Sequence, residues 1–175
     1  MKDEISVLLT EEEIDRRIRE MGAEISRDYE GRTVHLICVL KGGTFFMCEL
    51  AKRISLPATI DFMSVSSYGD SSVSSGIVKI IKDLDKPLEG KDVIVVEDII
   101  DTGRTLSYLL KVLKDRKPNS IRLAAMLDKP DRRVVDDVNV DYTGFVIPDE
   151  FVVGYGLDYA DRYRNLPYIG ILHLS

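Results

Sequence analysis

The sequence predicts an α/β protein built on an open, mostly parallel, twisted sheet that is flanked by helices. Short apolar runs typical of buried strands alternate along the chain with segments whose apolar residues recur at helical spacing. The run Val93–Val96 is apolar at every position, which is typical of a strand covered on both faces in a parallel sheet. The length of 175 residues is that of one domain. We therefore expect residues 1–175 to form a single domain.

The first expected element is an amphipathic helix. Thr10 and Glu13 have the spacing of a capping box, and apolar residues then recur every three or four positions from Ile14 to Ile25. A β-α unit follows, with the pair Gly42-Gly43 in its turn. In chain order, we expect strands at 34–40, 60–65, 93–96 and 121–127, and helices at 44–50 and 106–113. Ligands of such a sheet bind at the carboxyl ends of its strands.

Two segments do not fit this alternation. Serines crowd the stretch from Ser64 to Gly76, and we expect a mobile lid at about 66–77, because loops of this length often close over a site. An interdomain linker is the alternative, but neither flank is long enough for a complete second domain. The tail 142–175 is rich in aromatic residues and glycine. We expect it to form part of a small N- and C-terminal hood over the sheet edge.

Charge and composition exclude several functions. The 24 Lys and Arg against 30 Asp and Glu give a net charge of −6, which argues against a nucleic-acid binder. The start Met1–Glu4 is unlike a secretory signal, and no apolar run is long enough to cross a bilayer. We expect a cytoplasmic protein with no membrane partner. Cys38 and Cys48 are then expected to be small core residues.

A phosphate site is predicted at residues 93–105. Neither Gly90-Lys91 nor 154–156 completes a P-loop or a dinucleotide fingerprint. The apolar strand at 93–96 instead runs into Glu97 and Asp98, and then into a helix that opens at Gly103. Backbone N–H groups at that helix start, with the hydroxyls of Thr102 and Thr105, can surround a phosphate monoester. The two acids suit sugar hydroxyls or a hydrated Mg²⁺ instead.

The segment 93–105 resembles the signature with which purine phosphoribosyltransferases bind 5-phosphoribosyl-1-pyrophosphate (PRPP). The resemblance covers nearly the whole chain and is strongest to the compact bacterial branch that acts on hypoxanthine and guanine. It implies a magnesium-dependent enzyme of purine salvage. Such an enzyme transfers the 5-phosphoribosyl group from PRPP to N9 of hypoxanthine or guanine and releases IMP or GMP and pyrophosphate. Family members are commonly dimers or tetramers, which implies a homodimer or homotetramer here.

The resemblance also implies roles for residues around PRPP. Glu97 and Asp98 would hold the ribose hydroxyls and, with Asp158, the metal. Asp101 would be the general base. The 5-phosphate would bind to Asp101, Thr102, Gly103, Arg104 and Thr105; Arg104 departs from some relatives, which have lysine. The pyrophosphate would bind to Lys41 and Gly42, next to a cis peptide between Leu40 and Lys41, and to Arg164, with Ser67 and Tyr68 at the lid tip.

For the purine, the resemblance points to Lys129, Phe151, Val152 and Asp158. Lys129 can also be argued from its chemistry. Its ammonium group only donates hydrogen bonds, so it satisfies a 6-oxo group and leaves a 6-amino group facing donors. Hypoxanthine and guanine should therefore be preferred to adenine. The reaction should pass through an oxocarbenium-like state, and an ionised Asp101 can accept the proton that the purine loses.

Three alternatives stay open at this point. A phosphoacceptor receiver domain also has an apolar strand ending in acids, but it accounts poorly for residues 102–105 and for the lid. A PRPP-sensing regulator would not need Asp101 and Lys129, and the acidic charge suits nucleic-acid binding badly. The third is an adenine or pyrimidine transferase. His35, in an apolar strand, is expected to be a core histidine with satisfied hydrogen bonds, and we assign neither it nor His173 to a metal or to catalysis.

Overall fold

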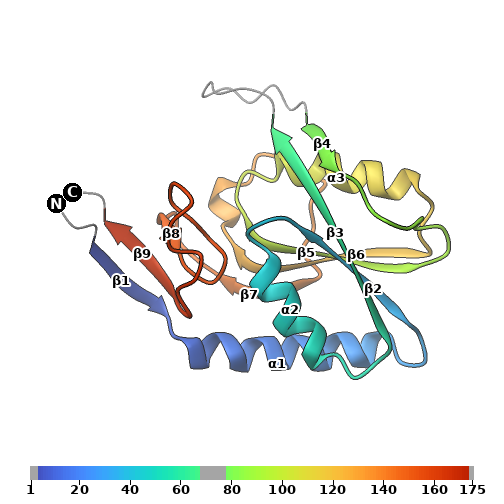
Figure 1. Cartoon of the computed structure of the whole chain (residues 1–175), viewed down its shortest axis with the longest axis horizontal. Helices are drawn as coiled ribbons and strands as arrows, with labels where there is room; N and C mark the ends of the chain where they lie inside the picture. Colours follow the sequence, from blue (N-terminus) through green and yellow to red (C-terminus); the bar gives the residue numbers. More distant parts are fainter. Residues whose placement is uncertain (1–3, 68–77, 174–175) are drawn as a thin grey trace.

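The computed structural model describes residues 4–67 and 78–173 (Figure 1). The chain order of elements begins with an N-terminal strand and helix and then alternates strands and helices. The bounds are β1 Glu4–Leu9, α1 Glu11–Asp28, β2 Val34–Val39, α2 Thr44–Arg53, β3 Ala58–Ser67, β4 Val78–Lys82, β5 Asp92–Ile100, α3 Arg104–Asp115, β6 Ser120–Asp128, the 3₁₀ helix η1 Pro130–Arg132, β7 Tyr142–Val146, β8 Val152–Val153 and β9 Ile169–His173.

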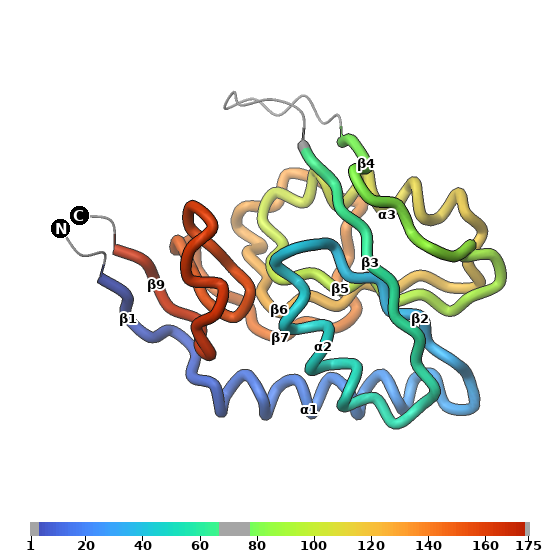
Figure 2. Tube along the Cα trace, in the orientation of Figure 1, coloured from blue at the N-terminus to red at the C-terminus, as the bar shows by residue number. Residues whose placement is uncertain are grey.

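The main sheet has the strand order β4-β3-β2-β5-β6-β7. All neighbouring pairs are parallel except β3 and β4, which are antiparallel. Helices α1 and α2 cover one face and α3 covers the other, as the trace in Figure 2 shows. The predicted class, a mostly parallel sheet flanked by helices, is confirmed.

Each face of the sheet has its own core. Ile94 and Val96 of β5 pack with α1 and α2, whereas Val93 and Val95 pack with α3. All four side chains are fully buried, as expected for a strand that is apolar on both faces. In the middle of the sheet, β5 pairs with β2 as far as Val96, and with β6 as far as Ile100, so its carboxyl end extends beyond β2 along β6.

Helix α1 begins where the sequence predicts. Thr10 accepts a hydrogen bond from the backbone N–H of Glu13, and the Glu13 carboxylate accepts one from the N–H of Thr10. This closes the capping box. The expected apolar stripe is buried from Ile14 to Ile25, so the helix lies on the sheet with one face.

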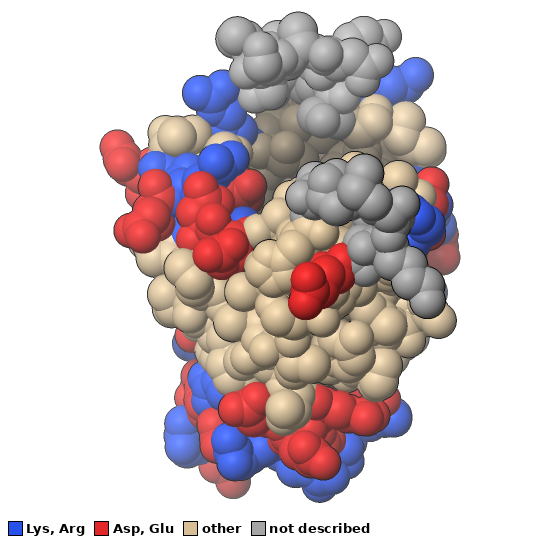
Figure 3. All heavy atoms as spheres, turned by 90° about the vertical axis from the view of Figure 1, so that its left-hand side faces the viewer, with Lys and Arg blue, Asp and Glu red and all other residues tan. Residues whose placement is uncertain are grey.

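A second, small sheet has the order β1-β9-β8, all antiparallel. It brings the two ends of the described chain together (Figures 1 and 2). Its outer face is mostly uncharged, with charged side chains grouped around it (Figure 3). Of the segment 142–175, β8 and β9 join this small sheet, while β7 is the edge strand of the main sheet.

Two expectations need correction. Strand β3 continues through Ser66 and Ser67, which pair with Lys79 and Val78 of β4, so the first two residues of the expected lid are strand. Tyr68 and the rest of that segment to residue 77 lie outside the described residues.

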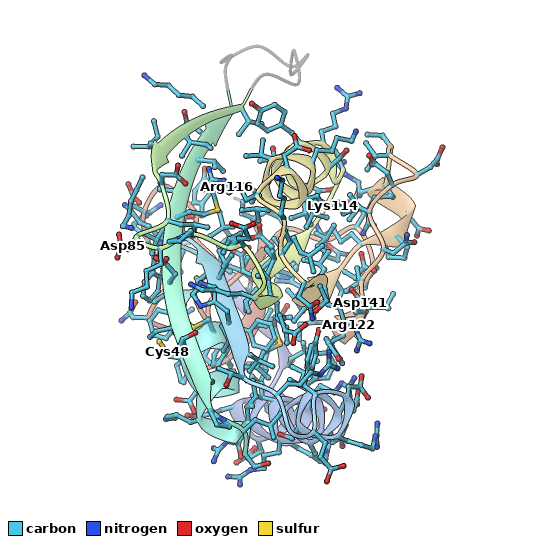
Figure 4. The ribbon with its side chains drawn as sticks, turned by 90° about the vertical axis from the view of Figure 1, so that its right-hand side faces the viewer. Cys48, Asp85, Lys114, Arg116, Arg122 and Asp141 are labelled. Atoms are coloured by element: carbon cyan, nitrogen blue, oxygen red, sulfur yellow. The ribbon has the colours of Figure 1, made fainter. Side chains whose placement is uncertain are left out.

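Cys38 is buried, and burial raises the pKa of its thiol to about 12. Cys48, by contrast, is exposed on α2 (Figure 4), because its side of the helix faces solvent.

No helix in the described part of the chain is both long and apolar enough to cross a membrane.

Candidate active site

The candidate site lies between β2 and β5, at the point where the order of strands in the main sheet reverses. Strand β2 pairs with β3 on one side and with β5 on the other, and β5 pairs onward with β6. The connections after β2 and β5 therefore diverge and leave a crevice at their carboxyl ends. A cavity of about 230 Å³ opens there. It is lined by Val39, Glu97, Ile99, Ile100, Asp101, Thr102, Gly103, Thr105 and Leu106.

The start of α3 forms one wall of this cavity. Gly103 precedes the helix with φ +81°, a left-handed conformation that glycine adopts without a Cβ penalty. A Cβ at this position would lie 2.8 Å from Val135 Cγ2 and 2.9 Å from Arg133 Cδ. The first N–H groups of the helix have no intrahelical acceptor and carry the positive end of its dipole. With Thr102 and Thr105 beside them, they can bind a phosphate group.

Two acids stand at the end of β5. Burial raises the pKa of Glu97 well above its ordinary value, and the neighbouring charge of Asp98 raises it further. Burial also raises the pKa of Asp98, although the N–H of Ile99, 2.8 Å from Asp98 Oδ1, stabilises its charged form. The folded protein thus holds two carboxylates whose negative charge is costly. A ligand with hydroxyl donors, or a cation, would relieve that cost.

The turn after β2 packs directly against Asp98. A Cβ added to Gly42 would lie 1.7 Å from Asp98 Oδ2, so only glycine fits beside this carboxylate. The peptide between Leu40 and Lys41 is cis, as the resemblance implied. These contacts bring the turn 40–43 to the end of β5.

A second strand end supplies Lys129, which follows β6. Lys129 is 7% exposed although it is charged. Its Nζ donates a hydrogen bond to the carbonyl of Glu150 at 2.7 Å and lies 3.5 Å from Asp149 Oδ1. These contacts fix the ammonium group at the start of the segment that carries the next residues, Phe151 and Val152.

Phe151 and Val152 differ in exposure. Phe151 is 49% exposed and meets Tyr159 edge to face, with ring centroids 5.6 Å apart. Val152 is buried in β8. A half-exposed aromatic ring beside a buried lysine can stack on a planar ligand while the lysine reaches its edge.

Asp158 and Arg164 pair with each other. Arg164 Nη2 lies 2.7 Å from Asp158 Oδ1, and Nη1 donates to the carbonyl of Gly156 at 2.7 Å. Asp161 lies 3.5 Å from Lys41 Nζ. A Cβ on Gly156 would be 2.1 Å from the carbonyl oxygen of Gly42. The loop after β8 is therefore packed onto the turn after β2.

Two arginines near the site were not singled out from the sequence. Arg132 Nε donates to Asp101 Oδ1 at 2.9 Å, and Arg133 Nε donates to the carbonyl of Asp101 at 3.3 Å. Arg133 also forms an ion pair with Asp128. The available signal was the pair of arginines three and four positions after Lys129.

The structure thus gathers most of the expected residues around one crevice. Ser67 ends β3, and Tyr68 lies outside the described residues. Among the residues with defined positions, no group of three or more His, Cys, Asp or Glu side chains is arranged to hold a metal by itself. Two carboxylates can still share a hydrated Mg²⁺ with a ligand, since Mg²⁺ usually keeps several waters and takes one or two carboxylates together with substrate phosphates.

Comparison with protein families and curated proteins gives a consistent result. The family model described as phosphoribosyl transferase domain matches residues 5–160. The chain is 54% identical over 173 residues to the hypoxanthine-guanine phosphoribosyltransferase of Bacillus subtilis, covering 98% of this chain and 96% of that protein. It is 59% identical over 166 residues to the bifunctional protein TilS/HprT of Listeria monocytogenes. It spans only 26% of that longer relative.

Solved structures show the same likeness in three dimensions. A hypoxanthine phosphoribosyltransferase from Staphylococcus aureus superposes with a TM-score of 0.93 at 50% identity, over 96% of this chain and 91% of that one. A hypoxanthine-guanine phosphoribosyltransferase from Bacillus anthracis, which holds a HEPES molecule in its active site, gives a TM-score of 0.92 at 47% identity, over 96% and 99%.

Proposed function

We propose that this protein, which belongs to the phosphoribosyl transferase domain family, is a hypoxanthine-guanine phosphoribosyltransferase. It transfers the 5-phosphoribosyl group from PRPP to N9 of hypoxanthine or guanine and releases IMP or GMP and pyrophosphate. The observation that carries the proposal is the end of β5, where Glu97 and Asp98 stand beside the start of α3. That arrangement suits a sugar phosphate, because acids and phosphate-binding amides lie within one short segment.

The first step of the mechanism is binding of the sugar phosphate. The amides at the start of α3, with Thr102 and Thr105, take the 5-phosphate, and Arg104 opens the same helix. Glu97 and Asp98 accept hydrogen bonds from the ribose hydroxyls. Their negative charge then lies beside the ribose as positive charge grows on its ring in the oxocarbenium-like state.

Charge on the departing pyrophosphate must be neutralised by the protein and the metal. Lys41 and Arg164 supply positive charge next to the turn that contains Gly42. Arg164 is already oriented by Asp158 and by the carbonyl of Gly156. Ser67 and Tyr68, at the expected lid, stay a prediction.

Glu97 and Asp98 fit a magnesium ion, because burial raises the pKa of both carboxyls, and the charge of a neighbouring acid raises it further: Asp98 for Glu97, and Asp158 for Asp98. When bound, Mg²⁺ supplies positive charge that stabilises the leaving pyrophosphate. Asp158 is the third carboxylate proposed on the metal side. Its ion pair with Arg164 holds it next to the arginine that is proposed for the pyrophosphate.

The purine is proposed to bind between Lys129 and the ring of Phe151, beside Val152 and Asp158. Lys129 donates to the 6-oxo group, which explains a preference for hypoxanthine and guanine over adenine. Asp101 accepts the proton that the purine loses as its nitrogen bonds to the ribose. The salt bridge with Arg132 orients this carboxylate in the free protein.

The test is ultraviolet difference spectroscopy of the purified chain. Hypoxanthine, guanine, xanthine and adenine are each mixed with PRPP and Mg²⁺, with a parallel set that contains a chelator. We expect conversion of hypoxanthine and guanine, little conversion of adenine, and loss of all conversion with the chelator. Absence of any PRPP-dependent change, with rapid labelling by acetyl phosphate, would instead support a receiver domain.

Three further predictions accompany the function: a cytoplasmic location, a homodimer or homotetramer, and one domain over 1–175 with a hood and a lid. Sedimentation velocity of the purified chain tests the assembly, and limited proteolysis tests the domain.

A further inference from the structure

A second cavity, of about 640 Å³, lies at the opposite end of the main sheet, away from the carboxyl ends of the parallel strands. It opens where β2 and β5 begin, and its lining includes His35, Asp92 and the connection between β4 and β5. Figure 4 looks onto this end of the molecule and labels Asp85, another lining residue. Its volume is in the range of small-molecule sites. His35 and Val39, which lines the candidate active site, are four positions apart in β2, roughly 13 Å of strand, so the two cavities are distinct.

His35 is a buried polar residue in the lining of this cavity. It is 3% exposed, and its Nδ1 lies 2.7 Å from Thr59 Oγ1. Its Nε2 is buried and has no hydrogen-bond partner among the residues that the structure describes. The expectation of a core histidine with satisfied hydrogen bonds is therefore wrong for one of its two nitrogens. Buried polar atoms are rarely left unpaired, and an exception calls for a ligand or water.

The surroundings of His35 favour the neutral form of its imidazole. Burial lowers the pKa of His35, the charges of Lys91 and Lys86 lower it further, and Asp61 opposes them. A neutral ring presents Nε2 either as a donor or as an acceptor, depending on whether Thr59 accepts from Nδ1 or donates to it. A ligand hydroxyl group can match either case, because it both donates and accepts.

The acids that line the cavity already have hydrogen-bond or ion-pair partners within the protein. Asp92 accepts hydrogen bonds from Arg32, Asn119 and Ser120, and Asp61 accepts from the N–H groups of Phe62 and Asp85. Asp85 pairs with Lys82 outside the lining.

The two lysines that line the cavity, unlike Asp85 and Asp92, have no ion-pair partner in the described part of the chain. Within 4–67 and 78–173, neither Lys86 nor Lys91 forms an ion pair. Both lysines line the cavity together with His35, and their charges act on its ring.

We propose that this cavity is a second ligand site, for a small hydroxylated dianion. Lys86 and Lys91 bind its anionic group, and His35 Nε2 bonds to its hydroxyl. A phosphate monoester and a hydroxydicarboxylate share this chemistry. The proposal does not depend on the reaction at the other edge of the sheet.

The test uses the fact that the chain has two histidines. In a ¹H–¹³C spectrum of the imidazole Cε1 groups, His35 reports on the cavity. His173, which is exposed and bonds to Ser6, reports on the general medium. Glycerol 3-phosphate and malate are titrated separately into the full chain, with sodium chloride at matched ionic strength as the reference. We expect a saturable shift of the His35 signal with at least one probe, while the His173 signal stays still.

Two variants make the result specific. Lys86→Gln combined with Lys91→Gln should weaken binding at least about tenfold, the usual scale for losing hydrogen bonds to charged groups. Lys111→Gln combined with Lys114→Gln, on the solvent side of α3, should leave it unchanged. The proposal is overturned if neither probe moves His35 saturably, if both histidines shift alike, or if the Lys86 and Lys91 variant binds as tightly as the control. A response to one probe alone identifies the anion.

Discussion

Arg132 Nε lies 2.9 Å from Asp101 Oδ1 and donates a hydrogen bond to it. The same arginine reaches Asp149, 3.4 Å away, which is also 3.5 Å from the ammonium group of Lys129. The hydrogen bond with Asp101 is the main cause of the raised pKa of Arg132. Asp101 and Lys129, which are both proposed to contact the purine, are therefore linked through the exposed side chain of Arg132 and the carboxylate of Asp149.

Asp101→Asn tests the proton acceptor. An amide keeps the size and most hydrogen bonds of the carboxylate but cannot take up the purine proton. We expect PRPP to bind with little change while kcat falls by about 10²–10⁴, the usual contribution of one positioned acid–base group. Single-turnover rates and PRPP binding by calorimetry measure the two effects. Asp131→Asn, at an exposed acid of η1, is the matched control, and an unchanged rate in Asp101→Asn would remove the assignment.

Lys129→Gln tests base choice. Glutamine offers both a donor and an acceptor, so it no longer discriminates strictly between a 6-oxo and a 6-amino group. We expect the ratio of kcat/KM for hypoxanthine to that for adenine to fall at least about tenfold, since a mismatched buried polar contact costs about 1–3 kcal/mol. The exposed Lys114→Gln is the control. If both variants keep the same ratio, Lys129 does not read the purine.

Much of the candidate site could be predicted because its parts are local in sequence. The acids, the phosphate turn and the helix start follow one apolar strand within 93–105, and Lys129 follows the next strand. Parallel strands bring their carboxyl ends to one edge, so a correct strand assignment also predicts that these segments are neighbours. The roles proposed for the individual residues stay predictions.

Other features depend on contacts that no local pattern reveals. Strand β1 pairs with β9, and the bond between Ser6 and His173 joins positions 167 residues apart. The approach of Arg132 to Asp101 depends on the path of the chain after Lys129. The unpaired nitrogen of His35 depends on the cavity beside it. Each of these follows from tertiary packing rather than from spacing along the chain.

Gly42→Ala tests the contact between the turn after β2 and Asp98. The new Cβ would lie 1.7 Å from Asp98 Oδ2, so the carboxylate must move from its position. We expect kcat/KM for PRPP to fall at least about tenfold, because small displacements of positioned groups cost up to about 10²-fold. Gly31→Ala is the control: its Cβ would meet nothing within 4 Å, although its φ of +76° makes alanine cost about 1–2 kcal/mol of stability. Activity equal to that of the control would contradict the contact.

Glu97→Gln tests the cost of charge at the end of β5. The pKa of Glu97 is raised in the folded protein by burial and by Asp98, so the folded state binds its proton more tightly than the unfolded state. Between the ordinary value of 4.5 and the raised value, stability therefore falls as pH rises. At neutral pH the neutral glutamine avoids this cost. We expect the ligand-free variant to be more stable by about 0.5–2 kcal/mol, the usual gain from relieving a strained functional site, and to lose activity.

Thermal unfolding at a series of pH values measures this gain. The difference in Tm between Glu97→Gln and the unsubstituted chain should be largest at neutral pH and should disappear below about pH 4.5, where Glu97 is protonated in both states. Glu89→Gln, at an exposed glutamate, should show no such dependence. Adding Mg²⁺ with PRPP should stabilise the unsubstituted chain more than the variant, because ligands bind the charged carboxylate. A variant that is less stable than the unsubstituted chain at neutral pH would contradict this prediction. It would show that the Glu97 carboxylate stabilises the ligand-free fold.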